Sequence, residues 1–346
     1  MIDPHVHLRD WNQQSKETVE HGISVAWRAG IDGIFEMPNT DPALTSRQTI
    51  EQRIAEADKA IRELGISFFH GLYAGITQSR EQIEEIVRAH QELFPRVVGL
   101  KMYAGHSTGN MGIIDEEAQR NVYRILTQLN YQGVLTVHCE KESELKPKLW
   151  TPENPFSHTV ARSPEAEVCS VKDQIQFAQE ARYRGTLHIA HVSVPETLVA
   201  IEEAREYAPC RITCEVAPHH CVLYDELMHE QDGIFLKMNP PLRLKSMQEQ
   251  MLQALIDGRI DCVATDHAPH TLRDKNRQYA SGIPGLPFYP HFIRYLRERM
   301  CKEDIERITH RRIEEIFEIQ IPNSNRHPEY DLAGEYEFNA FQIRKL

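Results

Sequence analysis

Hydrophobic residues in this chain follow two patterns that alternate along its length. Short apolar runs rich in β-branched and aromatic residues predict strands, and longer segments with an apolar residue at every third or fourth position predict helices. The predicted strands are Ile2–Leu8, Gly33–Met37, Ser67–Tyr73, Val97–Met102, Val134–His138, Thr186–His191, Arg211–Val216 and Cys262–Thr265. The predicted helices between them include Thr45–Leu64, Arg80–Leu93, Glu116–Leu129, Pro164–Arg184, Pro195–Tyr207 and Lys245–Asp257.

The alternation of strands and helices indicates the fold class. Eight strands separated by helical segments predict an α/β protein with a (β/α)8 TIM barrel. A doubly wound open sheet is the alternative, but no glycine-rich phosphate loop follows the first strand to support it. We expect the barrel to span residues 1–300. Residues 301–346 are expected to pack on it as a helix, Lys302–Phe317, and an irregular tail with an extended return strand at Asp331–Phe338.

Composition narrows the functional class. The formal net charge of -12 argues against a nucleic-acid-binding surface, because phosphate binding needs a basic field. No apolar run approaches the roughly 20 residues that span a bilayer, and the polar first residues do not resemble a signal peptide. The seven cysteines are irregularly spaced and several lie in apolar runs, which favours reduced thiols. These features predict a soluble, cytoplasmic protein that binds neither nucleic acid nor membrane.

Metal-ligand residue types stand at or near the ends of five predicted strands. Alternate residues of a strand share a face, so one face of the first strand would carry Asp3, His5 and His7. The same rule groups Val97, Gly99 and Lys101; Val134, Thr136 and His138; Leu187, Ile189 and His191; and Cys262, Ala264 and Asp266. Active sites form at the carboxyl ends of barrel strands. The predicted metal ligands are therefore His5, His7, Lys101, His138, His191 and Asp266.

Each of these residues alone has an ordinary explanation, such as a core histidine, a salt-bridge lysine or a helix cap. Their coincidence at five strand ends favours a metal centre. Histidine and carboxylate ligands suit zinc or a similar divalent ion. Lys101 fits such a set if CO2 carboxylates its amine, since an ammonium repels a cation whereas a carbamate can bridge two ions.

Several motifs resemble the dihydroorotase family of cyclic amidohydrolases. Asp3-Pro4-His5-Val6-His7-Leu8-Arg9 resembles the first family motif, and Ala264-Thr265-Asp266-His267-Ala268-Pro269-His270, followed by Lys275, resembles the second. Four blocks between them look like the intervening family blocks in their usual order: 37–40, 99–103, 214–220 and 237–243. The resemblance covers roughly residues 2–300, and the combination of motifs is highly specific.

The resemblance implies a zinc-dependent hydrolase that interconverts dihydroorotate and N-carbamoyl-L-aspartate in pyrimidine biosynthesis. It implies that His5 and His7 hold one zinc ion and that His138 and His191 hold a second, with carboxylated Lys101 as the bridge. Asp266 would bind the first zinc and carry the proton during catalysis.

The resemblance also implies a substrate site. The substrate carboxylate would be received by Arg9, Asn39 and His270, and the pyrimidine ring would be held by Asn239, Ser281 and Gly282. A hydantoinase or allantoinase is the near alternative, but it would share the metal ligands without the carboxylate-binding pattern. A non-catalytic scaffold subunit is the distant alternative, and it would have no need of the metal ligands.

Some features stay open. Amidohydrolases commonly carry a small β-sandwich, which is expected here to be reduced or absent because the first barrel strand begins at Met1. The glycine-rich stretch 104–112 is either a lid or an ordinary surface loop. Four polar residues near the mouth are candidates to support the ligands: His188, Glu215, His219 and His220. A homo-oligomer and an association with aspartate carbamoyltransferase are both left open.

Overall fold

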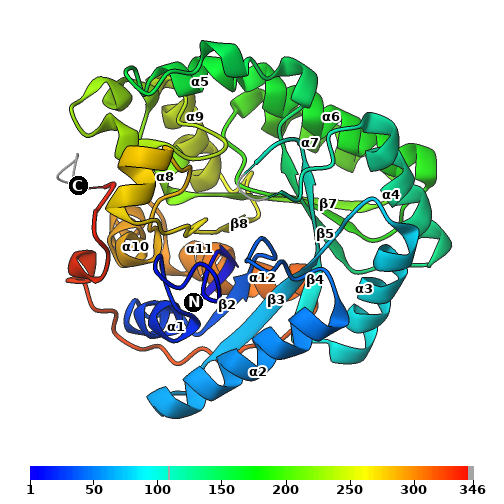
Figure 1. The fold of residues 1–346 in the computed structure, drawn as a ribbon, viewed down its shortest axis with the longest axis horizontal. Coiled ribbons are helices and arrows are strands. Elements are labelled where there is room, and N and C mark those ends of the chain that lie inside the picture. Colours follow the sequence, from blue (N-terminus) through cyan, green and yellow to red (C-terminus); the bar gives the residue numbers. More distant parts are fainter. Residues whose placement is uncertain (108–109, 342–346) are drawn as a thin grey trace.

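The computed structural model describes residues 1–107 and 110–341, and one sheet of eight parallel strands lies at its centre (Figure 1). The strands are β1 (Ile2–Val6), β2 (Gly33–Glu36), β3 (Phe69–Gly75), β4 (Val97–Ala104), β5 (Val134–Cys139), β6 (Thr186–Ile189), β7 (Arg211–Val216) and β8 (Cys262–Val263). Each strand pairs with the next, and a parallel bridge between Val6 and His267 joins β1 to the segment after β8. The backbone N–H of His7 donates to the carbonyl of His267 at 2.7 Å. The predicted (β/α)8 barrel is confirmed.

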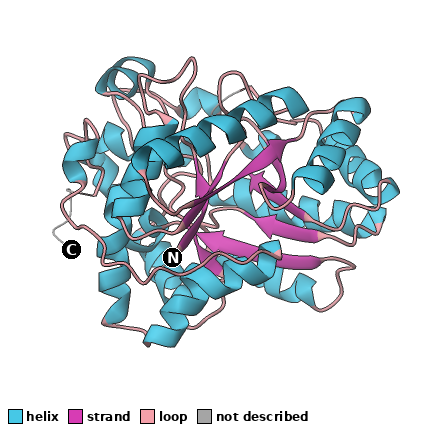
Figure 2. Ribbon diagram, turned by 90° about the horizontal axis from the view of Figure 1, so that it is seen from below, coloured by secondary structure: helices cyan, strands magenta, loops and turns pink. Residues whose placement is uncertain are grey.

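Helices surround the strands and cover them from outside (Figure 2). Their first residues follow caps that the sequence supplies: Ser46 and Asp115, for example, accept hydrogen bonds from the backbone N–H groups of Thr49 and Ala118. The helices are α1 (Val19–Arg28), α2 (Arg47–Leu64), α3 (Arg80–Leu93), α4 (Glu116–Gln128), α5 (Ser157–Ala161), α6 (Pro164–Ala181), α7 (Pro195–Arg205), α8 (Pro218–Val222), α9 (Lys245–Ile256), α10 (Tyr289–Arg297), α11 (Lys302–Glu306) and α12 (Arg312–Phe317).

The faces of two strands differ from simple alternation. In β6, Leu187 and Ile189 belong to the core cluster shared with the outer helices, and His188 points inward, where it contacts Glu215. The prediction that Leu187 and Ile189 share the face of His191 was therefore wrong. Alternation ends with the strand at Ile189, and His191 then adopts a left-handed backbone conformation with φ 34°.

β4 departs from alternation for a different reason. The pairing register of β3 with β4 shifts between Leu72 and Tyr73. Val98 consequently packs in the inner cluster while Val97 joins the outer one. The grouping of Val97 with Lys101 was therefore wrong, because a register shift moves side chains from one face to the other.

The last part of the chain closes the amino-terminal end of the barrel. The ring of Phe317 in α12 lies 4.9 Å from that of Phe35 and 6.0 Å from that of Tyr73, and these residues form one buried cluster. The tail then runs back beside α1 (Figure 1), where the N–H of Glu329 donates to the carbonyl of Arg28 at 2.8 Å.

The predicted return strand at Asp331–Phe338 was wrong. A short 3-10 turn, Ala333–Glu335, occupies this stretch, and the N–H of Glu335 donates to the carbonyl of Leu332. The carboxylate of Glu335 binds Arg28, so side-chain contacts rather than sheet pairing hold the segment. No second sheet occurs among the residues described. Within that same part of the chain, none of the helices has the length and apolar character needed to cross a membrane.

Candidate active site

Two histidines of β1 and the segment that follows it face an aspartate across the barrel closure. Oδ1 of Asp266 lies 3.3 Å from Nε2 of His5 and 3.2 Å from Nε2 of His7. All three side chains are buried, and their ligand atoms lie within 4.8 Å of one another. Nδ1 of His7 is held by Oδ1 of Asn39 at 2.6 Å. The Nε2 atoms therefore face the barrel mouth, as in a site with metal-binding geometry.

A second histidine pair lies beside the first. Nδ1 of His138, at the end of β5, lies 3.0 Å from Nε2 of His191, which follows β6. The other ring nitrogen of His138, Nε2, contacts Oε2 of Glu140 at 2.9 Å. The ring centroids of His5 and His191 are 5.2 Å apart, so the two pairs form one continuous cluster.

Lys101 lies in the barrel interior with no accessible surface. Its Nζ has no hydrogen-bond partner among the described residues, although it lies 5.1 Å from the centre of the Tyr103 ring. Burial lowers the pKa of Lys101 to about 8, against the opposing effect of the Glu215 and Asp266 carboxylates. A buried amine without an acceptor is costly, so this atom is suited to a group that the protein chain itself does not provide.

The backbone bends sharply where the strands deliver these residues. Arg9, His191 and Asp266 have φ values of 57°, 34° and 48°, in the left-handed region that side chains other than glycine seldom adopt. Such conformations cost of order 1–3 kcal/mol each and persist where surrounding structure enforces them. All three lie just beyond strand ends, at the mouth of the barrel.

Carboxylates behind the histidines fix the orientation of the rings. Oε1 of Glu215 lies 2.5 Å from Nδ1 of His5, and its Oε2 lies 3.1 Å from Nε2 of His188. Burial raises the pKa of Glu215, but the neighbouring histidines outweigh it and the net shift is downward. Glu215 thus stays ionised and holds His5 with Nε2 outward. His188, Glu215 and Cys262 also form a second cluster of potential ligand atoms deeper in the barrel.

The sequence did not single out Glu140. It is fully buried, and Arg162 Nε donates to its Oε1 at 2.9 Å. Burial raises its pKa, but Arg162 and His138 together shift the pKa well below the ordinary value. The available signal was a carboxylate two residues after His138, just beyond the end of β5.

His219 and His220, the other two residues predicted to support the ligands, have different surroundings. Nε2 of His220 lies 3.2 Å from the carbonyl oxygen of Pro240 and so ties α8 to the following loop. His219 is fully buried, and neither of its ring nitrogens has a hydrogen-bond partner in the described part of the chain. Neither residue lines the cavity at the barrel mouth.

The residues present fit divalent metal ions. Burial lowers the pKa of His5 to about 4 and lowers the pKa values of His7, His138 and His191. All four are consequently neutral near pH 7, which is the form that binds a metal. Neutral imidazoles aimed at one centre, with their outer nitrogens held by Glu215, Asn39 and Glu140, are typical of such sites.

Arg9 lies beside this cluster and has hydrogen-bond donors without a partner among the described residues. Its side chain is 1% exposed, and Nε and Nη1 have no partner among the described residues. Nη2 lies 3.3 Å from Nε2 of His270, which is itself 3.0 Å from the carbonyl oxygen of Ser281. That carbonyl can only accept, so Nε2 of His270 carries the hydrogen and cannot accept from Arg9. The guanidinium therefore needs an acidic partner.

The other predicted substrate residues converge on the same cavity. It is lined by the metal-ligand candidates His5, His7, His138, His191 and Asp266, and by Arg9, Asn39, Asn239, Ser281 and Gly282. Ser107 also lines it, from the stretch predicted as lid or loop, of which residues 108 and 109 lie outside the described residues. Lys101 and His270 lie immediately behind the lining rather than on it.

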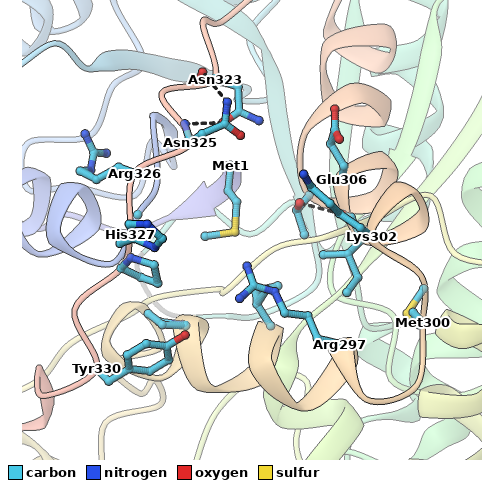
Figure 3. Close-up of a pocket in the computed structure, with 16 residues that line it drawn as sticks. Met1, Arg297, Met300, Lys302, Glu306, Asn323, Asn325, Arg326, His327 and Tyr330 are labelled. Carbon is cyan, nitrogen blue, oxygen red and sulfur yellow. Dashed lines mark hydrogen bonds between the residues drawn. The ribbon is translucent and has the colours of Figure 1, made fainter.

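A larger cavity lies elsewhere. It measures about 590 Å³ and surrounds Met1 at the amino-terminal end of the barrel, with Arg297, Lys302 and His327 on its walls (Figure 3). None of the predicted site residues lines it. Convergent polar groups, rather than size, therefore identify the candidate active site.

Comparison with known proteins identifies the family of the chain. No family model matches the chain. The chain is 34% identical to a dihydroorotase from Thermococcus kodakarensis, covering 83% of this chain and 59% of that protein. It is 30% identical over 326 residues to a dihydroorotase from Listeria monocytogenes, covering 89% of this chain and 70% of that protein. The chain belongs to the dihydroorotase family.

The chain is shorter than its dihydroorotase relatives, and solved structures of related enzymes share its fold. The chain spans 59% and 63% of the dihydroorotases from Thermococcus kodakarensis and Halobacterium salinarum. Among solved structures, the L-hydantoinase (dihydropyrimidinase) from Arthrobacter aurescens gives a TM-score of 0.79 at 22% identity, covering 92% of this chain and 70% of that one. The dihydropyrimidinase from Brevibacillus agri gives 0.76 at 22% identity. These structures show the same barrel fold.

Proposed function

We propose that this dihydroorotase family member hydrolyses dihydroorotate to N-carbamoyl-L-aspartate and catalyses the reverse ring closure. The supporting observation is Arg9, a buried cation with unpaired donors beside the histidine cluster. A guanidinium fork matches a carboxylate in shape and charge. Dihydroorotate carries a carboxylate on its ring, whereas hydantoin and allantoin carry none.

We assign two zinc ions to the histidine cluster. His5, His7 and Asp266 would hold one ion and His138 and His191 the other, with the carbamate of Lys101 between them. The lowered pKa of Lys101 supports carboxylation, because the neutral amine is the form that reacts with CO2. When bound, the ions supply Lewis acidity that polarises a ring carbonyl and lowers the pKa of water at the site.

Asp266 would move the proton. Its Oδ1 lies 3.3 Å from Nε2 of His5 and 3.2 Å from Nε2 of His7, beside the nitrogens that would hold the first ion. The carboxylate accepts a proton from the attacking water and returns it to the ring nitrogen as the carbon–nitrogen bond breaks, acting first as general base and then as general acid.

The substrate residues would orient the ring. Arg9 pairs with the substrate carboxylate, and the amide nitrogen of Asn39 is the end of that side chain suited to donate to it. His270 donates to the Ser281 carbonyl and lies beside Arg9, leaving the guanidinium for the substrate carboxylate. Asn239 and the Ser281–Gly282 backbone line the same cavity and would face the polar edge of the ring.

A turnover assay tests this proposal. Purified protein loaded with zinc should open dihydroorotate, and it should also close N-carbamoyl-L-aspartate. Ring closure consumes a proton as a carboxylate becomes an amide, so the equilibrium should favour dihydroorotate at acid pH and the open form at alkaline pH. Faster turnover of hydantoin or allantoin than of dihydroorotate would identify a different cyclic amidohydrolase. No turnover of any ring amide by the zinc-loaded protein would favour a scaffold.

A further inference from the structure

Lys275 is a fully buried lysine whose ammonium group binds three backbone carbonyls and no side-chain acceptor among the described residues. It lies in the turn Asp274–Gln278, after the segment that carries Asp266. Its Nζ donates to the carbonyl oxygens of Lys237 at 2.9 Å, Ala280 at 3.1 Å and Gly282 at 3.0 Å. An ammonium has three hydrogens, so these contacts use all of them.

The charge of this lysine has no acidic partner. Lys275 forms no ion pair within the described residues, and the Phe338 ring lies 5.6 Å from Nζ. Burial lowers its pKa well below the ordinary value, and neighbouring Lys237 lowers it further. Burying a cation costs free energy unless polar groups compensate. Three carbonyl dipoles supply that compensation here, so the lysine is tied closely to the two segments that provide them.

Those two segments form one wall of the candidate active site. Met238 and Asn239 follow directly after Lys237, and Ser281 lies between the carbonyl groups of Ala280 and Gly282 that Lys275 binds; Met238, Asn239, Ser281 and Gly282 all line the cavity. The N–H of Gly282 also donates to the carbonyl of Lys237 at 2.9 Å. The ammonium therefore fastens together two stretches far apart in sequence at the place where both meet the cavity.

The second segment has little freedom to move. Gly282 has φ +139°, and a Cβ atom there would lie 2.6 Å from the carbonyl oxygen of Ala268. Nζ of Lys237 donates to Oγ of Ser281 at 2.7 Å, and His270 binds the Ser281 carbonyl. Each carbonyl from Ala280 to Gly282 thus receives a hydrogen bond from a lysine or histidine.

We propose that Lys275 is a positioning residue that sets the geometry of the ring-binding wall through the backbones of Met238–Asn239 and Ser281–Gly282. This proposal rests on the proposed function for the identity of the ring. It assigns Lys275 to substrate binding rather than to proton transfer, because none of its contacts reaches Asp266 or the histidine cluster. Its loss should therefore raise KM more than it lowers kcat.

Two substitutions of graded strength test the proposal. Lys275→Met keeps the length of the side chain and removes all three donors, whereas Lys275→Gln keeps an amide that can donate to two of the carbonyls. Amide hydrogen exchange at Gly282 should speed up in Lys275→Met and to a smaller extent in Lys275→Gln. KM for dihydroorotate should rise roughly ten- to a hundredfold in Lys275→Met, with kcat within about threefold of wild type and unchanged zinc content.

Arg326→Met is the matched control. Arg326 also binds backbone carbonyls, those of Trp27 at 3.0 Å and Ile31 at 2.8 Å, but at the opposite end of the barrel. This variant should lose thermal stability without a change in KM or in exchange at Gly282. The comparison separates a general loss of stability from a specific effect on the wall.

The experiment separates an error in the proposed substrate from an error in the proposed role of Lys275. Wild-type protein that turns over a different ring amide would overturn the proposed substrate, and KM for that ring would then test Lys275. Amide hydrogen exchange at Gly282 tests, without any substrate, whether Lys275 holds the two segments together. Wild-type KM and wild-type exchange in Lys275→Gln and Lys275→Met would overturn the positioning role. If Lys275→Met does not fold, an unchanged KM in Lys275→Gln alone overturns it.

Discussion

Nδ1 of His5 lies 2.5 Å from Oε1 of Glu215. This contact spans most of the barrel sequence, since the two residues are 210 positions apart. It fixes which ring nitrogen of His5 faces the mouth, because a carboxylate holds the opposite nitrogen. Glu140 does the same for His138 at 2.9 Å. The histidine cluster is thus oriented from behind by two buried carboxylates.

The first prediction concerns these carboxylates. Glu215→Gln and Glu140→Gln keep side-chain size but remove the charge that makes the imidazole a better ligand. Each should weaken zinc affinity by roughly 10- to 100-fold while the fold persists. Competition with a chelator, read by metal analysis, measures the change. Glu202→Gln, which alters an exposed carboxylate paired with Arg259, is the control; equal affinity in all three variants would contradict the role.

The second prediction concerns the bridge. Lys101→Ala should lose both zinc and turnover, because it removes the amine whose carbamate would bridge the two histidine pairs. Short carboxylic acids should partly restore turnover by occupying the bridging position. Metal analysis and activity with and without added acetate or propionate test this, with Lys172→Ala, an exposed lysine, as control. Full metal content and near-normal turnover in Lys101→Ala would refute the bridge.

The third prediction concerns proton transfer. Asp266→Asn keeps an oxygen near the Nε2 atoms of His5 and His7 but cannot accept and return a proton. It should retain much of its zinc and lose at least about a thousandfold in kcat, since both proton steps use the same carboxylate. Steady-state kinetics on metal-loaded variant and wild type measure the loss. A decrease under tenfold would leave Asp266 as a ligand only.

The sequence predicted the barrel and the convergence of its histidines because both follow from local patterns. Strands alternate with helices, and His5, His7 and His138 stand at strand ends where the mouth of a barrel must lie. Parallel strands bring those ends together whatever the detailed packing. Placing residues at strand ends was therefore sufficient to predict that these side chains lie close together.

Other parts of the site depend on contacts that local patterns do not contain. His191 and Asp266 reach the cluster through left-handed backbone turns beyond their strands, so period-two alternation assigned the wrong neighbours to His191. Glu140 contacts His138 and is itself paired with Arg162, a loop residue 22 positions further along the chain. Such pairings are set by tertiary packing and become visible only in the folded barrel.

The last prediction concerns which cyclic amide is the substrate, and it rests on Arg9. Arg9→Met keeps the apolar stem and removes the charged fork. Losing a charge-assisted contact in a buried site costs about 1.5–3 kcal/mol, so kcat/KM for dihydroorotate should fall roughly ten- to a hundredfold. Hydantoin and dihydrouracil, which lack the carboxylate, should be poor substrates of wild type and should change far less in the variant.

Arg9→Lys separates charge from shape. Lysine keeps a positive charge but not the planar pair of donors that matches a carboxylate, so its kcat/KM for dihydroorotate should lie between those of wild type and Arg9→Met. Wild type and both variants should be assayed side by side on dihydroorotate, allantoin and hydantoin. If dihydroorotate turnover were indifferent to Arg9, or if hydantoin were preferred, the histidine cluster would serve another member of the cyclic amidohydrolases, because the carboxylate contact is the feature that distinguishes this substrate from its uncharged relatives.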